Sequence, residues 1–214
     1  MQVTHEESAL RKQINRLMSS NWRRKVPPGQ EVWLSGYTDA SYAANGPHRG
    51  AAWGIWIRDH DRRVLRSAPC PPWVTDSRQS VNHAELCGVH AAAMTILEKL
   101  DTERGNIAVV KTDSQAVARM FGWKGRPRYP KHIEALRLVA EVYEKMEEAE
   151  IKFIVKWVKA HKERHSTQGY LNDRVDNMAG KARQFNRPFE WEGEIDREKD
   201  AAQKAARQSQ RNGA

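Results

Sequence analysis

Four acidic residues stand where a folded domain could bring their side chains together. They end predicted strands or lie in predicted helices: Asp39, Glu85, Asp113 and Asp176. A carboxylate at the end of a buried strand costs free energy unless a positive group accompanies it. Four converging carboxylates also repel one another, and hard oxygen ligands suit Mg²⁺ or Mn²⁺. The acids therefore predict a divalent metal site.

Each acid also has a purely structural explanation. Asp commonly ends a strand at a turn, which would account for Asp39. Asn82 and Glu85 have capping-box spacing, so Glu85 could serve only a backbone N–H at a helix start. Asp113 or Ser114 could cap the following helix. Asp176 could simply be an exposed acid on a charged helix.

A succession of strands and helices must position these acids. A strand at 31–39 is followed by two apolar segments with short connections, 51–57 and 62–67, which predict an antiparallel meander. Helical and strand periods then alternate, in the order helix 82–100, strand 107–112, helix 114–121, helix 133–149, strand 151–160 and helix 172–185. The order predicts an α/β domain whose mixed sheet is flanked by helices.

The chain divides into three parts by composition. Residues 1–29 are basic, and Leu10, Ile14 and Leu17 share one helical face, so this arm either docks on the domain or binds nucleic acid. Residues 30–189 hold the predicted catalytic domain. Residues 190–214 are charged and predict a frayed helix or disorder.

The overall composition narrows the class of partner. The chain has 214 residues and a net charge of +9, which favours nucleic acid first and an anionic membrane surface second. Its two cysteines, Cys70 and Cys87, form neither a disulfide framework nor a zinc pattern, so we expect a reducing, cytoplasmic location. No segment approaches the about 20 apolar residues of a membrane span or resembles a signal peptide. We expect no membrane association.

Five short motifs follow one another along the chain: Tyr37–Ser41, Asn82–Leu86, Thr112–Ser114, Trp157–His161 and Asn172–Ala179. In this order and on these elements they resemble the type 1 ribonuclease H (RNase H) family, over about residues 31–185. The resemblance implies an RNase H-like fold, with a mixed five-stranded sheet flanked by helices. Ala40 and Ala160 stand where that family usually has Gly.

The resemblance also implies an activity and a set of catalytic residues. The activity is metal-dependent endonucleolytic hydrolysis of the RNA strand of RNA–DNA hybrids. Two Mg²⁺ ions, which Mn²⁺ can replace, would be held by Asp39, Glu85, Asp113 and Asp176. His161 would assist proton transfer or product departure. Two metals on either side of a scissile phosphate activate the water and stabilise the leaving oxygen.

Substrate contacts are implied in two places. The resemblance places Ala40, Ser41 and Asn82 beside the RNA strand, where contacts with the 2′-hydroxyl distinguish RNA from DNA. The loop at 123–131 interleaves aromatic and basic residues, as expected of a surface that follows a phosphate backbone. Its candidate residues are Trp123, Lys124, Arg126, Arg128 and Lys131. A solvated loop without a partner is the alternative.

Two other functions stay open at this point. One is a non-catalytic scaffold of the same fold that binds hybrids, for which the loss of an acid would be the mark. The other is a nuclease of the same fold that acts on DNA. We expect a monomer, and the sequence does not indicate a protein partner.

Overall fold

The computed structural model describes residues 4–75, 80–102, 105–125, 127–159 and 167–194. These residues form one six-stranded sheet in the order β5-β4-β1-β2-β3-β6. The strands are β1 (Trp33–Ala43), β2 (Gly50–Arg58), β3 (Arg62–Pro69), β4 (Ile107–Thr112), β5 (Lys152–Trp157) and β6 (Phe189–Glu194). The helices are α1 (His5–Arg23), α2 (Pro72–Thr75), α3 (Ser80–Lys99), α4 (Gln115–Met120), α5 (Ile133–Glu148) and α6 (Thr167–Phe185). The prediction of an α/β domain is confirmed.

The sheet is mixed because its central strand has neighbours of both orientations. β1 runs antiparallel to β2 and parallel to β4, and β4 runs parallel to β5. The predicted meander corresponds to β1, β2 and β3. Alternate residues of these strands point to opposite faces. Leu34, Ile55 and Val110 are fully buried in the main core, between the sheet and the helices on one face.

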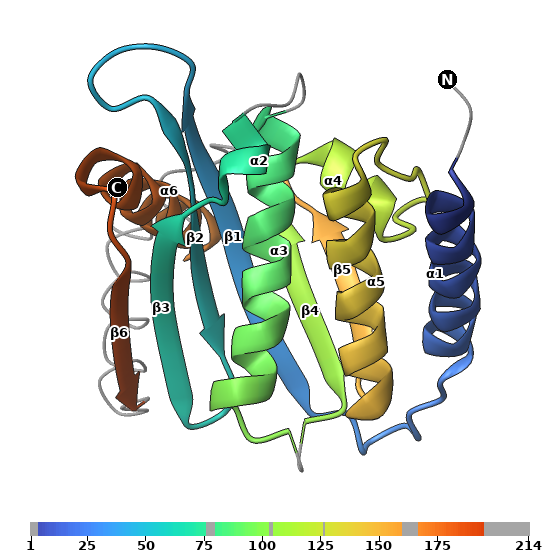
Figure 1. Ribbon diagram of the computed structural model, residues 1–214. Coiled ribbons are helices and arrows are strands. Elements are labelled where there is room, and N and C mark those ends of the chain that lie inside the picture. The colour runs from blue at the N-terminus through green and yellow to red at the C-terminus, as the bar shows by residue number, and fades with distance from the viewer. Residues whose placement is uncertain (1–3, 76–79, 103–104, 126, 160–166, 195–214) are drawn as a thin grey trace.

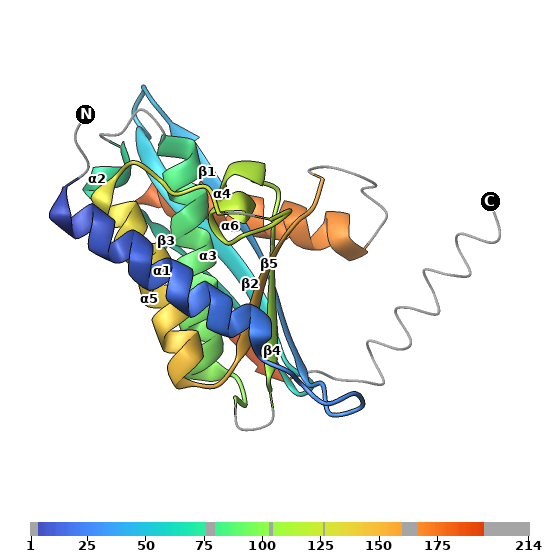
Figure 2. The same cartoon turned by 90° about the vertical axis from the view of Figure 1, so that its right-hand side faces the viewer.

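Helices cover both faces of the sheet. α1, α3 and α5 lie on one face, and α6 lies on the other (Figures 1 and 2). α6 packs on β1, β2 and β3, while α3 packs on β1 and β2 from the opposite side. β1 is therefore enclosed between two helices. None of the described helices is both long and apolar enough to cross a membrane.

The N-terminal helix docks on the domain, which is one of its two predicted arrangements. Ile14 and Leu17 are buried, and α1 packs along α5. Asn21 is buried too: its Nδ2 donates to the Phe153 carbonyl at 2.9 Å, and its Oδ1 accepts the Phe153 N–H at 2.7 Å. Phe153 belongs to β5, the last strand at this edge of the sheet. The side chain of Asn21 thus satisfies backbone groups that an edge strand leaves unpaired.

The sixth strand corrects two predictions. We expected five strands, and a frayed helix or disorder over residues 190–214, but at 189–194 the strand β6 pairs antiparallel with β3. The rest of that range, 195–214, lies outside the described residues. The ion pairs Arg66–Glu190 (2.6 Å) and Lys99–Glu192 (2.8 Å) hold β6 in place. The acids that suggested an unstructured tail therefore find cationic partners on β3 and α3.

Candidate active site

Three carboxylates converge at one edge of the sheet. Asp39 lies in β1 and Asp113 directly follows β4, each two residues beyond the paired residues Tyr37 and Lys111 of these parallel neighbours. Glu85 lies in α3, above β1. One carboxylate oxygen from each of the three acids lies within 4.8 Å of the others. The convergence predicted for these acids is present in the structure.

Two glycines allow the flanking helices to come this close. A Cβ on Gly88 of α3 would lie 2.0 Å from Thr38 Oγ1. A Cβ on Gly54, the residue of β2 opposite Asp39, would lie 2.3 Å from the carbonyl oxygen of Val175 in α6. A larger residue at either position would force the neighbouring atoms to move, and at Gly54 these are backbone atoms of α6. The absence of a side chain at these positions therefore brings both helices to Asp39.

α6 adds two polar residues beside this cluster. Asn172 is buried and its Nδ2 donates to Asp39 Oδ2 at 3.3 Å. Asp176 lies one helical turn later, is exposed, and is close enough for its charge to raise the pKa of Asp39. It is not part of the tight group of three. The fourth acid thus stands at the solvent side of the cluster.

Burial and like charge together make two of the acids reluctant to ionise. Burial, followed by the charge of Asp113, raises the pKa of Asp39 from its ordinary 3.8 to about 7. Burial, followed by the charges of Asp39 and Asp113, raises the pKa of Glu85 well above its ordinary value. Only 7% of Asp39 and 4% of Glu85 are exposed. Such groups need a nearby positive charge in order to ionise.

The hydrogen bonds to these two carboxylates come from neutral donors. The Ala40 N–H donates to Asp39 Oδ1 at 2.8 Å and to Glu85 Oε1 at 3.2 Å. The Thr112 hydroxyl donates to Glu85 Oε2 at 3.3 Å. Neutral donors leave the mutual repulsion in place. A compact set of hard oxygen ligands that repel one another fits a divalent cation such as Mg²⁺ or Mn²⁺.

Of the two capping roles predicted from the sequence, the structure contains one and lacks the other. Asn82 and Glu85 do not form a capping box, because α3 already begins at Ser80 and both lie inside it. Ser114 does cap α4, through its Oγ and the Val117 N–H at 3.3 Å. Asn82 Oδ1 accepts a hydrogen bond from Ser114 Oγ at 3.4 Å. Asn82 is therefore held beside the acid cluster, although it does not cap α3.

The other predicted substrate residues follow directly after Asp39. Ala40 is half-buried and its N–H already serves the two carboxylates. Ser41 is half-buried, and its Oγ accepts from Arg183 Nε at 2.9 Å. Arg183 belongs to α6 and also donates to the His48 carbonyl at 2.6 Å. Ser41 thus ties the end of β1 to the last turn of the same helix that carries Asp176.

The basic loop is connected to the acid cluster through two neighbouring indoles. Trp157 Nε1 donates to the Asp113 carbonyl at 2.8 Å, and the ring of Trp157 lies 5.5 Å from that of Trp123. Beyond Trp123, the loop exposes Lys124, Arg128 and Lys131. Two predicted residues, Arg126 and His161, lie outside the described residues.

The sequence does not single out four residues that the structure brings to the site. Asn172 was recognised only as the start of a motif, although its position one helical turn before Asp176 places it on the same face. Gly54 and Gly88 carried no signal, because the need for close approach arises only when distant elements pack. Trp157 likewise appeared only as a motif residue, and its link to Asp113 depends on the tertiary structure.

Fold and site together define an α/β protein with a buried carboxylate cluster at the end of its central strands. The RNase H family profile matches residues 32–184. The chain belongs to the RNase H family. No curated protein sequence matches it significantly.

Solved structures share this fold at low sequence identity. LC9-RNase H1, a type 1 RNase H with the type 2 active-site motif, is 20% identical, with 86% of each chain covered and a TM-score of 0.54. RNase H1 from the halophilic archaeon Halobacterium salinarum NRC-1 is 15% identical, with 70% of this chain and 98% of that chain covered and a TM-score of 0.46. LC11-RNase H1, in complex with an RNA/DNA hybrid, is 17% identical, with 68% of this chain and 95% of that chain covered and a TM-score of 0.47.

Proposed function

We propose that this protein is an endonuclease that hydrolyses the RNA strand of RNA–DNA hybrids and requires a divalent metal. The observation that carries the proposal is the group formed by Asp39, Glu85 and Asp113, two of them buried, with oxygen atoms within 4.8 Å of one another. Membership of the RNase H family supports the class of reaction. A non-catalytic scaffold would have no need to retain such a repulsive group of acids.

The residues present fit two Mg²⁺ ions, or Mn²⁺ in their place. Asp39, Glu85 and Asp113 would hold them, and Asp176 would complete the set from the solvent side. Bound metal of this kind lowers the pKa of a water molecule and stabilises charge on a leaving oxygen. His161 is proposed, from the family motif, to assist proton transfer or product departure.

The surrounding residues hold the carboxylates in place before substrate arrives. Asn172 and the Ala40 N–H each donate to one oxygen of Asp39, and Thr112 donates to Glu85. These bonds fix the orientation of both carboxylates. The burial of Asp39 and Glu85 keeps bulk water from their inner oxygens. A site fixed in this way reorganises little during reaction.

The substrate is proposed to lie across the same edge of the sheet. Ala40, Ser41 and Asn82 border the carboxylates and would approach the RNA strand, whose 2′-hydroxyl distinguishes it from DNA. The exposed cations of the loop would follow the phosphates of the hybrid. Trp123 packs on Trp157, and the ring of Tyr129 packs toward α1, near Arg11. This loop would therefore bind mainly through charge.

Cleavage of matched duplexes tests the proposed function. We expect the purified protein to cut the RNA strand of an RNA–DNA hybrid with Mg²⁺ or Mn²⁺, and to be inactive in excess chelator. RNA–RNA and DNA–DNA duplexes of the same sequence should resist. Undiminished cleavage in chelator would refute the role of metal, and equal cleavage of DNA–DNA would favour the DNA nuclease instead.

Replacing Lys124, Arg128 and Lys131 with Ala should weaken hybrid binding most strongly at low salt. Each cation that no longer neutralises a phosphate should flatten the slope of log K against log salt by about 0.9. At saturating hybrid the cleavage rate should persist, because the carboxylates are untouched. Affinity measured across a salt series checks this expectation. An unchanged slope would assign the loop to solvated surface.

A further inference from the structure

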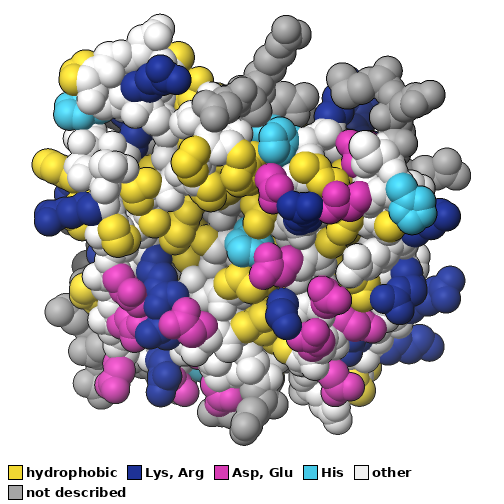
Figure 3. Space-filling model, in the orientation of Figure 1, with side chains coloured by type: hydrophobic (Ala, Val, Ile, Leu, Met, Phe, Trp, Pro, Cys, Tyr) yellow, Lys and Arg dark blue, Asp and Glu magenta, His cyan; other side chains and the backbone are white. Residues whose placement is uncertain are grey.

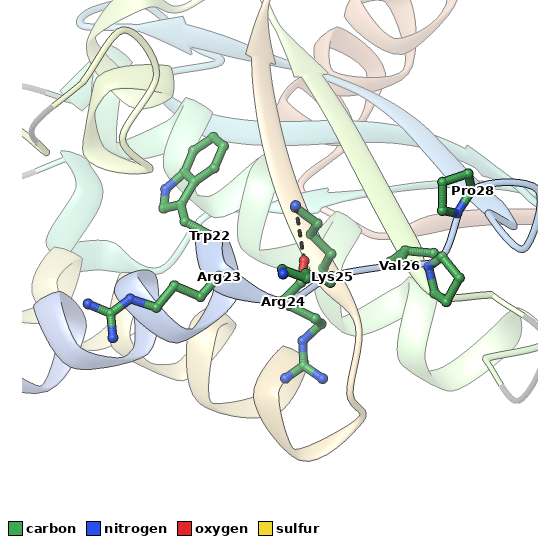
Figure 4. A pocket seen from close by; sticks show the side chains of 8 residues that line it. Trp22, Arg23, Arg24, Lys25, Val26 and Pro28 are labelled. Atoms are coloured by element: carbon green, nitrogen blue, oxygen red, sulfur yellow. Dashed lines mark hydrogen bonds between the residues drawn. The ribbon is translucent and has the colours of Figure 1, made fainter.

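The end of α1 forms a hollow that the proposed function does not use. Trp22, Arg23, Arg24, Lys25 and Lys152, with Val26, Pro27 and Pro28, line a groove of about 820 Å³. Figure 4 shows Trp22 and Arg23 projecting from the last turn of the helix, with Val26 and Pro28 along the segment that follows. We call this hollow the Trp22 groove.

The described residues that line the Trp22 groove include four cations and no acid. Arg24 Nη2 is paired with Glu147 at 2.7 Å, and Lys152 Nζ donates to the Arg24 carbonyl at 3.1 Å, so both are held in position. Arg23 and Lys25 are exposed. Lys and Arg side chains gather over α1 along the right-hand edge of Figure 3. The charge of this groove is complementary to a polyanion.

An exposed indole gives the groove a second kind of contact. Trp22 has 48% of its surface exposed, although it lies on a helix whose other apolar residues include the buried Ile14 and Leu17. An aromatic ring beside cations suits the bases and phosphates of a single strand, because every base has a face that can stack. A duplex, with its bases already stacked, would use only the cations.

Trp22 links the groove to the segment that leads into the basic loop. The Trp22 Nε1 would lie 3.5 Å from a Cβ on Gly122, the residue just before Trp123. β5 connects the two ends of this surface, since Lys152 begins the strand and Trp157, which contacts Asp113, ends it. The two ends of this strand are separated by roughly 17 Å. A single strand leaving the carboxylate cluster past the loop would reach the groove within a few nucleotides.

We propose that the Trp22 groove binds a single-stranded extension of the hybrid. A base would stack on Trp22, and the adjoining phosphates would lie against Arg23 and Lys25. This proposal rests on the proposed function for the identity of the hybrid, but binding alone tests it. The N-terminal helix then extends the substrate surface beyond the duplex.

The test compares a labelled blunt RNA–DNA hybrid with the same hybrid carrying an oligothymidine extension, at either end of the DNA strand. Binding is measured by fluorescence anisotropy in chelator, so that no cleavage occurs. One extension should tighten binding to the wild type. Trp22→Ala should remove that gain by lowering the affinity for the extended hybrid about fivefold or more. Its affinity for the blunt hybrid should equal that of the wild type. Trp22→Phe should retain most of the gain, because it keeps a ring against Gly122.

The charge contribution is tested separately. Arg23→Ala with Lys25→Ala should flatten the salt dependence for the extended hybrid by about 0.7 per contact. The matched control, Arg62→Ala with Arg187→Ala, removes two exposed cations at the opposite edge of the sheet. It should leave the affinity for the extended hybrid and its salt dependence unchanged. Equal affinity for blunt and extended hybrids in the wild type would overturn the proposal, as would an unchanged gain in Trp22→Ala. Cleavage of the blunt hybrid with Mg²⁺ is measured alongside, and its absence would refute the nuclease activity but not the groove.

Discussion

Asp39→Asn is expected to abolish hybrid cleavage while raising the thermal stability of the metal-free protein. Asn keeps the shape, and its amide oxygen can still accept the Ala40 N–H. Its NH2 group takes the place of the oxygen that accepts from Asn172, so the Asn172 amide must turn its own oxygen toward it. The substitution removes the charge at the centre of the cluster. Metal stabilisation of the reaction contributes several kcal/mol and about 1.36 kcal/mol corresponds to a tenfold change in rate, so we expect the rate to fall at least about a hundredfold.

The stability gain should depend on pH in a defined direction. The pKa of Asp39 rises from 3.8 to about 7 in the folded protein, so the folded state binds the proton more tightly than the unfolded state does. The free energy of unfolding of metal-free wild type therefore falls as the pH rises from about 4 to about 7. Asp39→Asn lacks this contribution and should be more stable by a few kcal/mol above about pH 7.

Thermal unfolding in chelator at several pH values checks this expectation. The matched control is Asp61→Asn, an exposed acid in the turn between β2 and β3, which should leave cleavage unchanged. Near wild-type cleavage by Asp39→Asn would remove this residue from the site. A variant that unfolds earlier than the wild type at neutral pH would show that the cluster is not repulsive.

Gly54→Ala is expected to cost both stability and activity. Its new Cβ would meet the Val175 carbonyl at 2.3 Å, a backbone atom that cannot rotate aside. α6 would have to move away from β2, and Asn172 and Asp176 would leave Asp39 with it. Overpacking of this kind typically costs about 1–3 kcal/mol. Displacement of groups by about 1 Å can lower the rate about a hundredfold.

Gly180→Ala provides the control within the same helix. Nothing lies within 4 Å of a Cβ at that position, so the change should stabilise α6 by up to about 1 kcal/mol. Thermal unfolding and hybrid cleavage are measured for both variants. If Gly54→Ala kept the melting temperature and the cleavage rate of the wild type, the position of α6 beside the acids would not depend on close packing at Gly54.

The sequence by itself determined the succession of strands and helices and the convergence of three acids. Two local patterns carried this information: the strand and helix periods of the apolar residues, and short motifs at the ends of those elements. β1 and β4 run parallel as neighbours, so Asp39 of β1 and Asp113, which follows β4, lie close together. The order of the short motifs predicts this convergence.

Only the tertiary structure decided the features that depend on partners distant in sequence. From the sequence, the N-terminal segment either docks on the domain or binds nucleic acid. Its docking depends on contacts such as that of Asn21, which satisfies Phe153 on the edge strand. β6 looked like an unstructured tail because its acids are paired only across the sheet, as Glu190 is with Arg66. The positions of α3 and α6 depend on glycines whose role appears only when the chain packs against them. Each of these outcomes is a contact between remote segments, and no local pattern of residues encodes such a contact.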